Sequence, residues 1–557
     1  MTSDAMKDIV NAQQAWEKKE VSKSAARFPE RQDTTSWSGL PVRRLYTPLD
    51  LATSSYLEDI GFPGEYPFLR GVQATGYRGK MWTRRPITGF NNPHITNERV
   101  RQLLKSGQTG LHFVFDYPTL AGYDSDHALA EGEIGVCGVP INTIADMREL
   151  LDGIDLSKIS ISYSHWGPYI LSFILAVAEE NGIPFEKISG TTQGDVLMYY
   201  HSCPWWDLPL RANMKLFVDV AEYTANSMPR WNPISISGYN IRDGGCSAVQ
   251  EMGFTIGDAI SYLDACLERG LTVEKVAPRL TFMLCSHMDF FEEICKMRAM
   301  RRMWAKLIKT RYKCDSPNAQ SLRFHAQTSG AALTAQQPLN NIARGALHAM
   351  AAVLGGANSL HISCFDETHG IPTEEAARVS LNTQNIIAFE TGVAETVDPL
   401  AGSYYVEAKT NELEEQAWKI IEEIDRQGGM IEAAENDWVR EQKLDWARRY
   451  QDEIDKKKRI IVGVNAFQLK DETSINFTRP DEEVQRRRVV DIGSFKRNRD
   501  HGKVRAAMED LRKAAAAGQN VMPYTIAAAR DNVTLGEMYE VMRSVFGEVP
   551  AEDKRYM

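Results

Sequence analysis

The chain has 557 residues, of which 43% are hydrophobic and 25% charged, a composition typical of a globular protein. This length suffices for two or three domains, or for one large barrel with additions. The net charge of −10 gives no electrostatic reason to expect binding to nucleic acid or to an anionic membrane surface.

Cysteine usage and the N-terminus indicate the compartment. Eight cysteines are scattered without a CxxC pair, which is typical of reduced thiols and predicts no metal site. The N-terminus lacks the apolar core of a signal peptide, and no apolar stretch approaches the ~20 residues that a membrane helix needs. We therefore expect a cytoplasmic protein.

The chain divides into three parts by pattern. Residues 1–45 predict an N-terminal helical arm, and residues 46–95 are rich in Gly, Pro, Arg and aromatics with little periodicity. From about residue 96, short apolar or alternating runs alternate with amphipathic helical patterns. Residues 431–557 are charged and helical, which predicts a C-terminal extension for packing or partner docking.

The rhythm of strands and helices predicts the fold class. Runs that predict strands lie at 110–118, 159–164, 188–193, 234–240, 278–287, 321–330, 358–367 and 402–407. Helical patterns include the stripe Ile144, Met147, Leu150 and Leu151 and residues 210–228, 247–269, 288–312, 373–391 and 409–427. About eight strand–helix units favour an α/β fold, a (β/α)8 TIM barrel within residues 46–430; a doubly wound sheet is the alternative.

Polar side chains alternate along these strands, where an ordinary barrel has Val, Ile and Leu. They are Ser160, Ser162 and Ser164; Thr191 and Gln193; Ser235 and Ser237; Arg323, His325 and Gln327; and His361 and Ser363. Facing the helices, each would be buried at a cost of roughly 1–3 kcal/mol. Facing inward, they would line a polar bore, which predicts a long polar ligand threaded through the barrel.

Six segments in one order carry a family resemblance. They are RGVQATGYRGKMWTRRPITGF (70–90), FDYPTLAGYDSDH (115–127), SISGYN (235–240), RFHAQTSG (323–330), DETHGIPTEEA (366–376) and DPLAGSYYVE (398–407). Together they resemble the large subunit of the adenosylcobalamin-dependent acyl-CoA mutases, the family of methylmalonyl-, isobutyryl- and 2-hydroxyisobutyryl-CoA mutases. The pattern is closest to the isobutyryl and 2-hydroxyisobutyryl types. The resemblance spans about residues 40 to 557 and implies a TIM barrel whose small polar lining surrounds the pantetheine arm of CoA.

The resemblance also implies a cofactor and partners. The family's cobalamin module carries Asp-x-His-x-x-Gly, whose His ligates cobalt, and this sequence does not contain it; DSDHALAEG and DETHG have the wrong spacing. The chain is thus expected to be a stand-alone substrate subunit that uses adenosylcobalamin held by a small cobalamin-binding subunit. A homodimer of heterodimers and a G-protein chaperone for cofactor loading are implied by the resemblance alone.

Matched positions imply the binding residues. The nucleotide and phosphate end of CoA is expected at Thr75, Lys80, Thr83 and Arg85, with Lys80 in place of the family's usual Arg. Pantetheine contacts are expected from Ser162, Ser164, Thr191, Gln193, Asn232, Arg279, Thr281, His325 and Gln327. For the cofactor, Glu367 is expected to hold the ribose of the 5′-deoxyadenosyl group, and Gly89, Phe115 and Gly330 to approach the corrin.

Three departures concern the acyl group. Methylmalonyl-specific relatives hold the free carboxylate with Tyr and Arg, and Ile87 and Cys203 stand at those positions here. Relatives of the 2-hydroxyisobutyryl type share the isoleucine but use Asp for the hydroxyl, where this chain has Val114. Because a desolvated carboxylate without a cation costs several kcal/mol, these residues predict a branched acyl group without a second carboxylate.

The fourth departure is Asn240, where the family has a His that hydrogen-bonds the thioester carbonyl. Asn can donate from its NH2 group but offers no titratable proton. His112 and His165 stand where relatives have smaller residues, and either could compensate.

The expected reaction is a radical 1,2-rearrangement in which the thioester group of the acyl-CoA migrates. Three alternatives remain: a catalytically silent CoA-binding paralogue, a cobalamin-independent barrel enzyme, and a methylmalonyl-CoA mutase proper.

Overall fold

The computed structural model describes residues 3–30, 34–202, 208–470 and 482–549. Its strands are β1 (Thr83–Arg84), β2 (Ile87–Thr88), β3 (Leu111–Val114), β4 (Ile161–Ser164), β5 (Gly190–Thr192), β6 (Trp231–Asn232), β7 (Ile234–Ser237), β8 (Leu280–Ser286), β9 (Phe324–Thr328) and β10 (Ser359–His361).

Helices are interspersed throughout. From the N-terminus through the barrel they are α1 (Ser3–Trp16), α2 (Ser22–Arg27), α3 (Gly76–Gly79), α4 (Pro93–Lys105), α5 (Tyr117–Leu120), α6 (Ile144–Leu150), α7 (Tyr169–Glu180), α8 (Val196–Ser202), α9 (Leu210–Ser227), α10 (Gly238–Asp243), α11 (Ala248–Glu268), α12 (Val273–Val276), α13 (Phe290–Thr310), α14 (Pro317–Gln320), α15 (Asn340–Leu354) and α16 (Glu374–Glu390). They continue as α17 (Tyr404–Arg426), α18 (Met430–Glu435), α19 (Trp438–Asp455), α20 (Glu482–Asn498), α21 (His501–Ala516), α22 (Met522–Arg530) and α23 (Leu535–Phe546).

The strand pairings, all parallel, close a barrel. One sheet has the order β1-β10-β9-β8-β7 and the other β2-β3-β4-β5-β6. Only Arg85 and Pro86 separate β1 from β2, and only Pro233 separates β6 from β7. Proline has no N–H for a ladder, so each pair is one strand in two halves that bond different neighbours. The two sheets thus share two strands, which confirms the predicted (β/α)8 barrel.

Two predictions about the strands differ from the structure. The run 402–407 is not a strand, because α17 begins at Tyr404 with the hydroxyl of Ser403 accepting from the backbone N–H of Val406. The eighth strand of the barrel, which was not predicted, is instead residues 83–88. Arg84, Arg85 and Pro86 interrupt its alternation of apolar and polar residues. The other predicted strands are confirmed.

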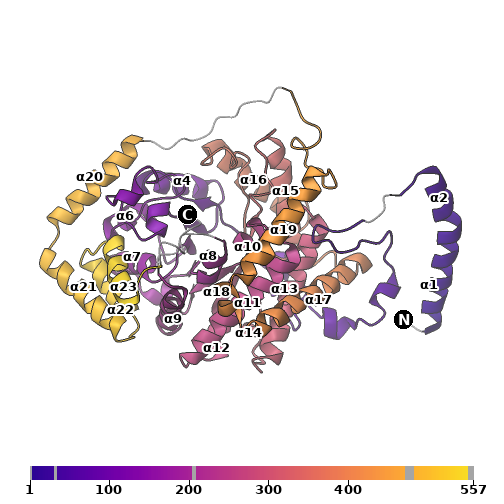
Figure 1. Ribbon diagram of the computed structural model, residues 1–557, viewed down its shortest axis with the longest axis horizontal. Helices are drawn as coiled ribbons and strands as arrows, with labels where there is room; N and C mark the ends of the chain where they lie inside the picture. The colour runs from indigo at the N-terminus through magenta and orange to yellow at the C-terminus, as the bar shows by residue number, and fades with distance from the viewer. Residues whose placement is uncertain (1–2, 31–33, 203–207, 471–481, 550–557) are drawn as a thin grey trace.

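Helices α1 and α2 and helices α20 to α23 lie on opposite sides of the molecule (Figure 1), whereas the N-terminal arm contacts the start of the C-terminal segment through Trp37, whose ring lies 6.0 Å from that of Tyr450. Helices α1 and α2, joined by η1 (Glu17–Val21), form a rod with no buried residue in η1 or α2. Helices α21, α22 and α23 pack together, and α22 lies against α7. Among the described helices, none is both long and apolar enough to cross a membrane. The division into residues 1–45, 46–430 and 431–557 stays a prediction.

A close approach between neighbouring strands requires glycine directly after β2. A Cβ on Gly89 would lie 2.0 Å from the carbonyl oxygen of Val114, an atom of the backbone that cannot turn away. We expect Gly89→Ala to lower the free energy of unfolding by roughly 1–3 kcal/mol, measured by chemical denaturation. Gly493→Ala on α20, where the nearest atom is the flexible end of Arg497 at 3.3 Å, is the control. Equal stability of both variants would contradict this contact.

Candidate active site

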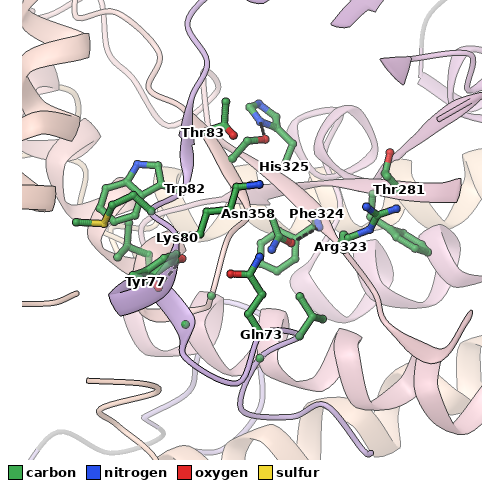
Figure 2. Close-up of a pocket in the computed structure, with 18 of the residues that line it drawn as sticks. Gln73, Tyr77, Lys80, Trp82, Thr83, Thr281, Arg323, Phe324, His325 and Asn358 are labelled. Atoms are coloured by element: carbon green, nitrogen blue, oxygen red, sulfur yellow. Dashed lines mark hydrogen bonds between the residues drawn. The ribbon is translucent and has the colours of Figure 1, made fainter. Parts of the chain in front are cut away.

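A cavity of about 300 Å³ occupies the amino-terminal half of the barrel bore (Figure 2). Its wall combines the first residues of the strands with the segment between Arg70 and Thr83. Lys80 and Gln73 reach toward it from this segment, opposite Thr281 and Arg323. The polar alternation along the strands therefore faces inward, as predicted.

The structure brings most of the residues predicted to bind CoA to this cavity. Those that line it are Lys80, Thr83, Arg85, Ser162, Thr191, Gln193, Asn232, Thr281 and His325. Of the other four, Thr75 directly precedes the lining residue Gly76, and Ser164 hydrogen-bonds Gln193. Arg279 donates to the carbonyl of Trp231 at 3.1 Å, and Gln327, which is 7% exposed, lies in register with Cys285. Their contacts to a ligand stay predictions.

The amino-terminal rim carries positive charge without an acidic partner. Arg279 donates to the carbonyl oxygens of Met228 and Trp231, and Arg323 donates to that of Pro278. Burial and the neighbouring Arg279 lower the pKa of Arg323. Since no ion pair of the described part of the chain involves these arginines, the rim can bind an anion. The sequence had placed Arg323 in the bore but had not suggested this role.

Neutral histidines line the middle of the bore. Burial, with Arg85 and His361 nearby, lowers the pKa of His112 to about 3, and burial lowers the pKa of His361 to about 3. His325 stacks near His112, with ring centroids 6.4 Å apart, and its pKa is also lowered, first by burial and then by His112. The middle of the bore is therefore polar but nearly uncharged, apart from Arg85, at neutral pH.

The buried imidazole of His361 should make stability depend on pH. Below about pH 6.5 the unfolded chain binds a proton at this residue that the folded chain does not bind until about pH 3, so His361 costs stability as the pH falls. We expect His361→Asn, whose oxygen can accept the N–H of Ile87 in place of Nδ1, to become more stable relative to wild type by roughly 2 kcal/mol between pH 6.5 and 5. Denaturation midpoints at both pH values measure this; a difference independent of pH would contradict it.

Ile87 and Val114 are apolar residues on the neighbouring strands β2 and β3. Ile87 lies in register with His112, and its backbone N–H donates to Nδ1 of His361 at 3.1 Å. Val114 lies in register with Ser164, which faces the bore. Neighbours in register on parallel strands share a face, so both apolar side chains point inward. Cys203, predicted at the position where methylmalonyl-specific relatives hold the carboxylate with Arg, lies outside the described residues.

Asn240 lies on α10, directly after β7. The hydroxyl of Ser237 donates to its Oδ1 at 2.7 Å and also caps the helix. Because the oxygen of the amide is engaged, the NH2 group is the part left to donate to a ligand. Asn240 is partly exposed and lies at the end of the barrel where the carboxyl ends of the strands open, the carboxyl mouth.

A second cluster surrounds Gly330 after β9. A Cβ at Gly330 would lie 2.7 Å from Oε1 of Glu367 and 3.4 Å from the hydroxyl of Tyr239. The backbone N–H of Gly330 donates to Asp243 at 2.9 Å. Burial raises the pKa of Glu367 to about 7. Glycine therefore leaves room for a carboxyl group and a phenol side by side, a set of partners suited to sugar hydroxyls.

Two predicted residues face the helices. Phe115 is 1% exposed, and its ring lies 6.0 Å from that of Tyr163 and 6.1 Å from that of His165. Its side chain thus packs in the core, and contact with a corrin stays a prediction. His165 is fully buried beside the carbonyl oxygens of Trp166 and Thr119. The expectation that His165 could compensate for Asn240 is wrong, because alternation after Ser164 turns it outward.

These features define a parallel α/β barrel with a polar, ligand-sized bore and a cluster of functional groups at its carboxyl mouth. Comparison with known proteins places it further. The family model described as methylmalonyl-CoA mutase matches residues 35–548. The chain therefore belongs to the methylmalonyl-CoA mutase family, whose members are isomerases that act as intramolecular transferases.

Relatives of two kinds are equally similar. The 2-hydroxyisobutanoyl-CoA mutase large subunit of Aquincola tertiaricarbonis is 41% identical over 541 residues, covering 96% of this chain and 95% of that one. The methylmalonyl-CoA mutase of Rhizobium meliloti is 41% identical over 518 residues, covering 92% of this chain and 72% of that one. The human mitochondrial methylmalonyl-CoA mutase is 39% identical, covering 93% and 69%. Overall identity therefore leaves the substrate open.

Proposed function

We propose that this chain is the large subunit of a two-subunit, adenosylcobalamin-dependent mutase that rearranges a branched short-chain acyl-CoA without a second carboxylate. Isobutyryl-, pivalyl- and 2-hydroxyisobutyryl-CoA are the candidate substrates. The observation that carries the proposal is the pair of inward-facing apolar residues Ile87 and Val114, which offer carbon where a carboxylate would need a cation. Ile87 has two polar neighbours, His112 and His361. Both imidazoles are neutral, because burial lowers the pKa of each to about 3.

The rest of CoA matches the bore. The cationic rim at Lys80, Arg279 and Arg323 suits the phosphates, and hydroxyls and amides along the strands suit the two amides of pantetheine. In this orientation the acyl group would meet Ile87, Val114 and the NH2 group of Asn240. The bore would thus position the substrate and exclude water from the thioester.

The carboxyl mouth fits the proposed cofactor. Glu367 and Tyr239 would hold the ribose of the adenosyl group, and Gly330 would leave room for it because a side chain there would displace Glu367. When bound, adenosylcobalamin supplies reversible hydrogen-atom abstraction, chemistry that no amino-acid side chain offers by itself. The cobalt ligand would come from the small subunit, since Asp-x-His-x-x-Gly is not in this sequence.

An exposed apolar patch that includes the segment between β9 and α15 supports the small subunit as a partner. Leu339, Phe467 and Leu469 are 58%, 76% and 59% exposed. Gln337 donates to the carbonyl of Phe467 at 3.0 Å, so these residues adjoin one another. Exposed apolar residues gathered in one place are typical of protein interfaces. A homodimer of heterodimers and a G-protein chaperone rest on the family resemblance.

A catalytically silent CoA-binding paralogue is the second candidate, and Asn240 in place of the family's His is the observation that favours it. Reconstitution with a small subunit carrying Asp-x-His-x-x-Gly and adenosylcobalamin separates the two. The proposal predicts isomerisation of a C4–C5 branched acyl-CoA together with the absorption spectrum of cob(II)alamin. Tight binding of these thioesters with neither isomerisation nor cob(II)alamin would favour the silent paralogue. Isomerisation without added cobalamin would favour a cobalamin-independent enzyme.

A further inference from the structure

One continuous hydrogen-bonded chain crosses four neighbouring strands inside the bore, from Arg85 in the strand at 83–88 to Gln193 at the end of β5. Arg85 donates to the hydroxyl of Ser162 at 3.1 Å, and that hydroxyl lies 2.8 Å from Nδ1 of His112. Nε2 of His112 lies 2.8 Å from the hydroxyl of Ser164, which donates to Oε1 of Gln193 at 2.6 Å. The imidazole therefore bridges two serines, and both of its nitrogens are engaged.

The contact at the far end of the chain indicates the direction of every hydrogen in it. The side-chain nitrogen of Gln193 lies 3.3 Å from the sulfur of Met283, and a thioether only accepts hydrogen bonds. The NH2 group of Gln193 thus faces the bore and its oxygen faces Ser164. Since Ser164 gives its one hydrogen to that oxygen, it must accept from Nε2 of His112.

The near end agrees with this direction. With the proton on Nε2, Nδ1 of His112 accepts from the hydroxyl of Ser162. The hydroxyl of Ser162 also lies 3.1 Å from the carbonyl of Leu111, but Arg85 already donates to that carbonyl, and Nδ1 of His112, at 2.8 Å, is the nearer acceptor for the single hydrogen of Ser162. Arg85 is a permanent donor, and the reversed chain would leave the oxygen of Gln193 against the sulfur of Met283 with no donor.

We propose that His112 is a positioning residue that locks the side-chain amide of Gln193 with its NH2 group toward the acyl thioester. Gln193 lines the cavity and follows β5, whose end adjoins that of β7: Asp195 accepts from the backbone N–H of Ser237, the residue that orients Asn240. His112 does not itself donate to the substrate, because both of its nitrogens are taken. This inference rests on the proposed function: it assigns to His112 the orientation of Gln193, one of the hydrogen-bond donors to the acyl-CoA.

The expected effect lies in recognition of the carbonyl oxygen. Without His112, Ser164 is free to accept from the Gln193 amide, which would then turn its oxygen into the bore and repel the thioester carbonyl. A hydrogen bond of about 1.4 kcal/mol corresponds to a tenfold change in affinity.

The test compares two ligands that differ in that oxygen alone, isobutyryl-CoA and its isobutyl thioether, bound to the full chain and measured by calorimetry. We expect Gln193→Leu and His112→Ala each to reduce the preference for the thioester by roughly tenfold, and the double variant to reduce it no further. Ser106→Ala is the control, because the exposed hydroxyl of Ser106 bonds the carbonyl of Gln102 at the end of α4, outside the bore. Its preference should equal that of wild type.

If His112→Ala does not fold, Ser164→Ala breaks the chain at the next link and should give the same loss. If the double variant lost the product of the two single reductions in preference for the thioester, the positioning role would be overturned. An unchanged preference in the single His112 variant would overturn it too. A wild-type chain that binds both ligands equally well would also overturn it, while leaving binding of acyl-CoA intact. A chain that binds neither would refute the proposed function as well.

Discussion

Asn240→Ala should lower kcat of the reconstituted mutase by roughly 10²–10³-fold, the usual effect of removing one preorganised donor to a developing charge. The amide is fixed in one orientation, because the hydroxyl of Ser237 donates to Oδ1 at 2.7 Å and leaves the NH2 group for the thioester carbonyl. KM should change far less, since most of CoA is held along the bore. Steady-state kinetics with isobutyryl-CoA measure both parameters.

Two further variants control this expectation. Asn181→Ala, at the exposed C-terminal end of α7, should leave kcat unchanged. Asn240→His restores a donor of different reach and should lose less activity than Asn240→Ala, with an altered substrate preference. Full activity of Asn240→Ala, or no change of any kind in Asn240→His, would show that this residue does not meet the thioester.

Lys296→Met should lower the free energy of unfolding by about 3–5 kcal/mol, because it leaves two buried carboxylates without their cation. Nζ of Lys296 lies 2.5 Å from both Glu251 and Glu293, and all three side chains are fully buried. Arg242, the other cation here, is at 3.9 and 3.5 Å. Chemical denaturation measures the loss.

This network also supports the site. Oε1 of Glu251 accepts the backbone N–H of Cys285 on β8, and a Cβ on Gly238, which begins α10, would lie 3.0 Å from Cγ of Glu251. Lys306→Met on the same helix is the matched control: Lys306 is 35% exposed in its pair with Glu414, so its loss should cost under about 1 kcal/mol. Equal effects of the two variants would contradict the burial argument.

Much of the barrel could be predicted from periodicity, and the failures have physical causes. The serines of β4 alternate with Ile161 and Tyr163, so their inward direction followed from the pleat. The strand at 83–88 was missed because Arg85 and Pro86 interrupt it, and the partners of the Arg85 guanidinium, among them Leu111 and Ser162, lie on other strands. At 402–407, alternation favoured a strand, but Ser403 caps a helix.

The site was predicted less completely than the fold. Matched positions gave the bore residues, but the sequence suggested for His112 only that it could compensate for Asn240, because its two serine partners come from the next strand and leave no local pattern. His165 was expected near the thioester of the substrate, but its side chain points away from the bore into the core, where it lies beside the carbonyl oxygens of Trp166 and Thr119. The buried network around Lys296 left no pattern in the sequence, since its members are spread over α10, α11 and α13.

The central claim is that the acyl end of the bore accepts a branched hydrocarbon and rejects a second carboxylate. The most direct measurement is the ratio of kcat/KM for isobutyryl-CoA to that for methylmalonyl-CoA, with the chain reconstituted with a small subunit and adenosylcobalamin. If the missing cation costs about 3 kcal/mol or more, the ratio should exceed roughly 10². A ratio below one, with methylmalonyl-CoA as the better substrate, would contradict the account.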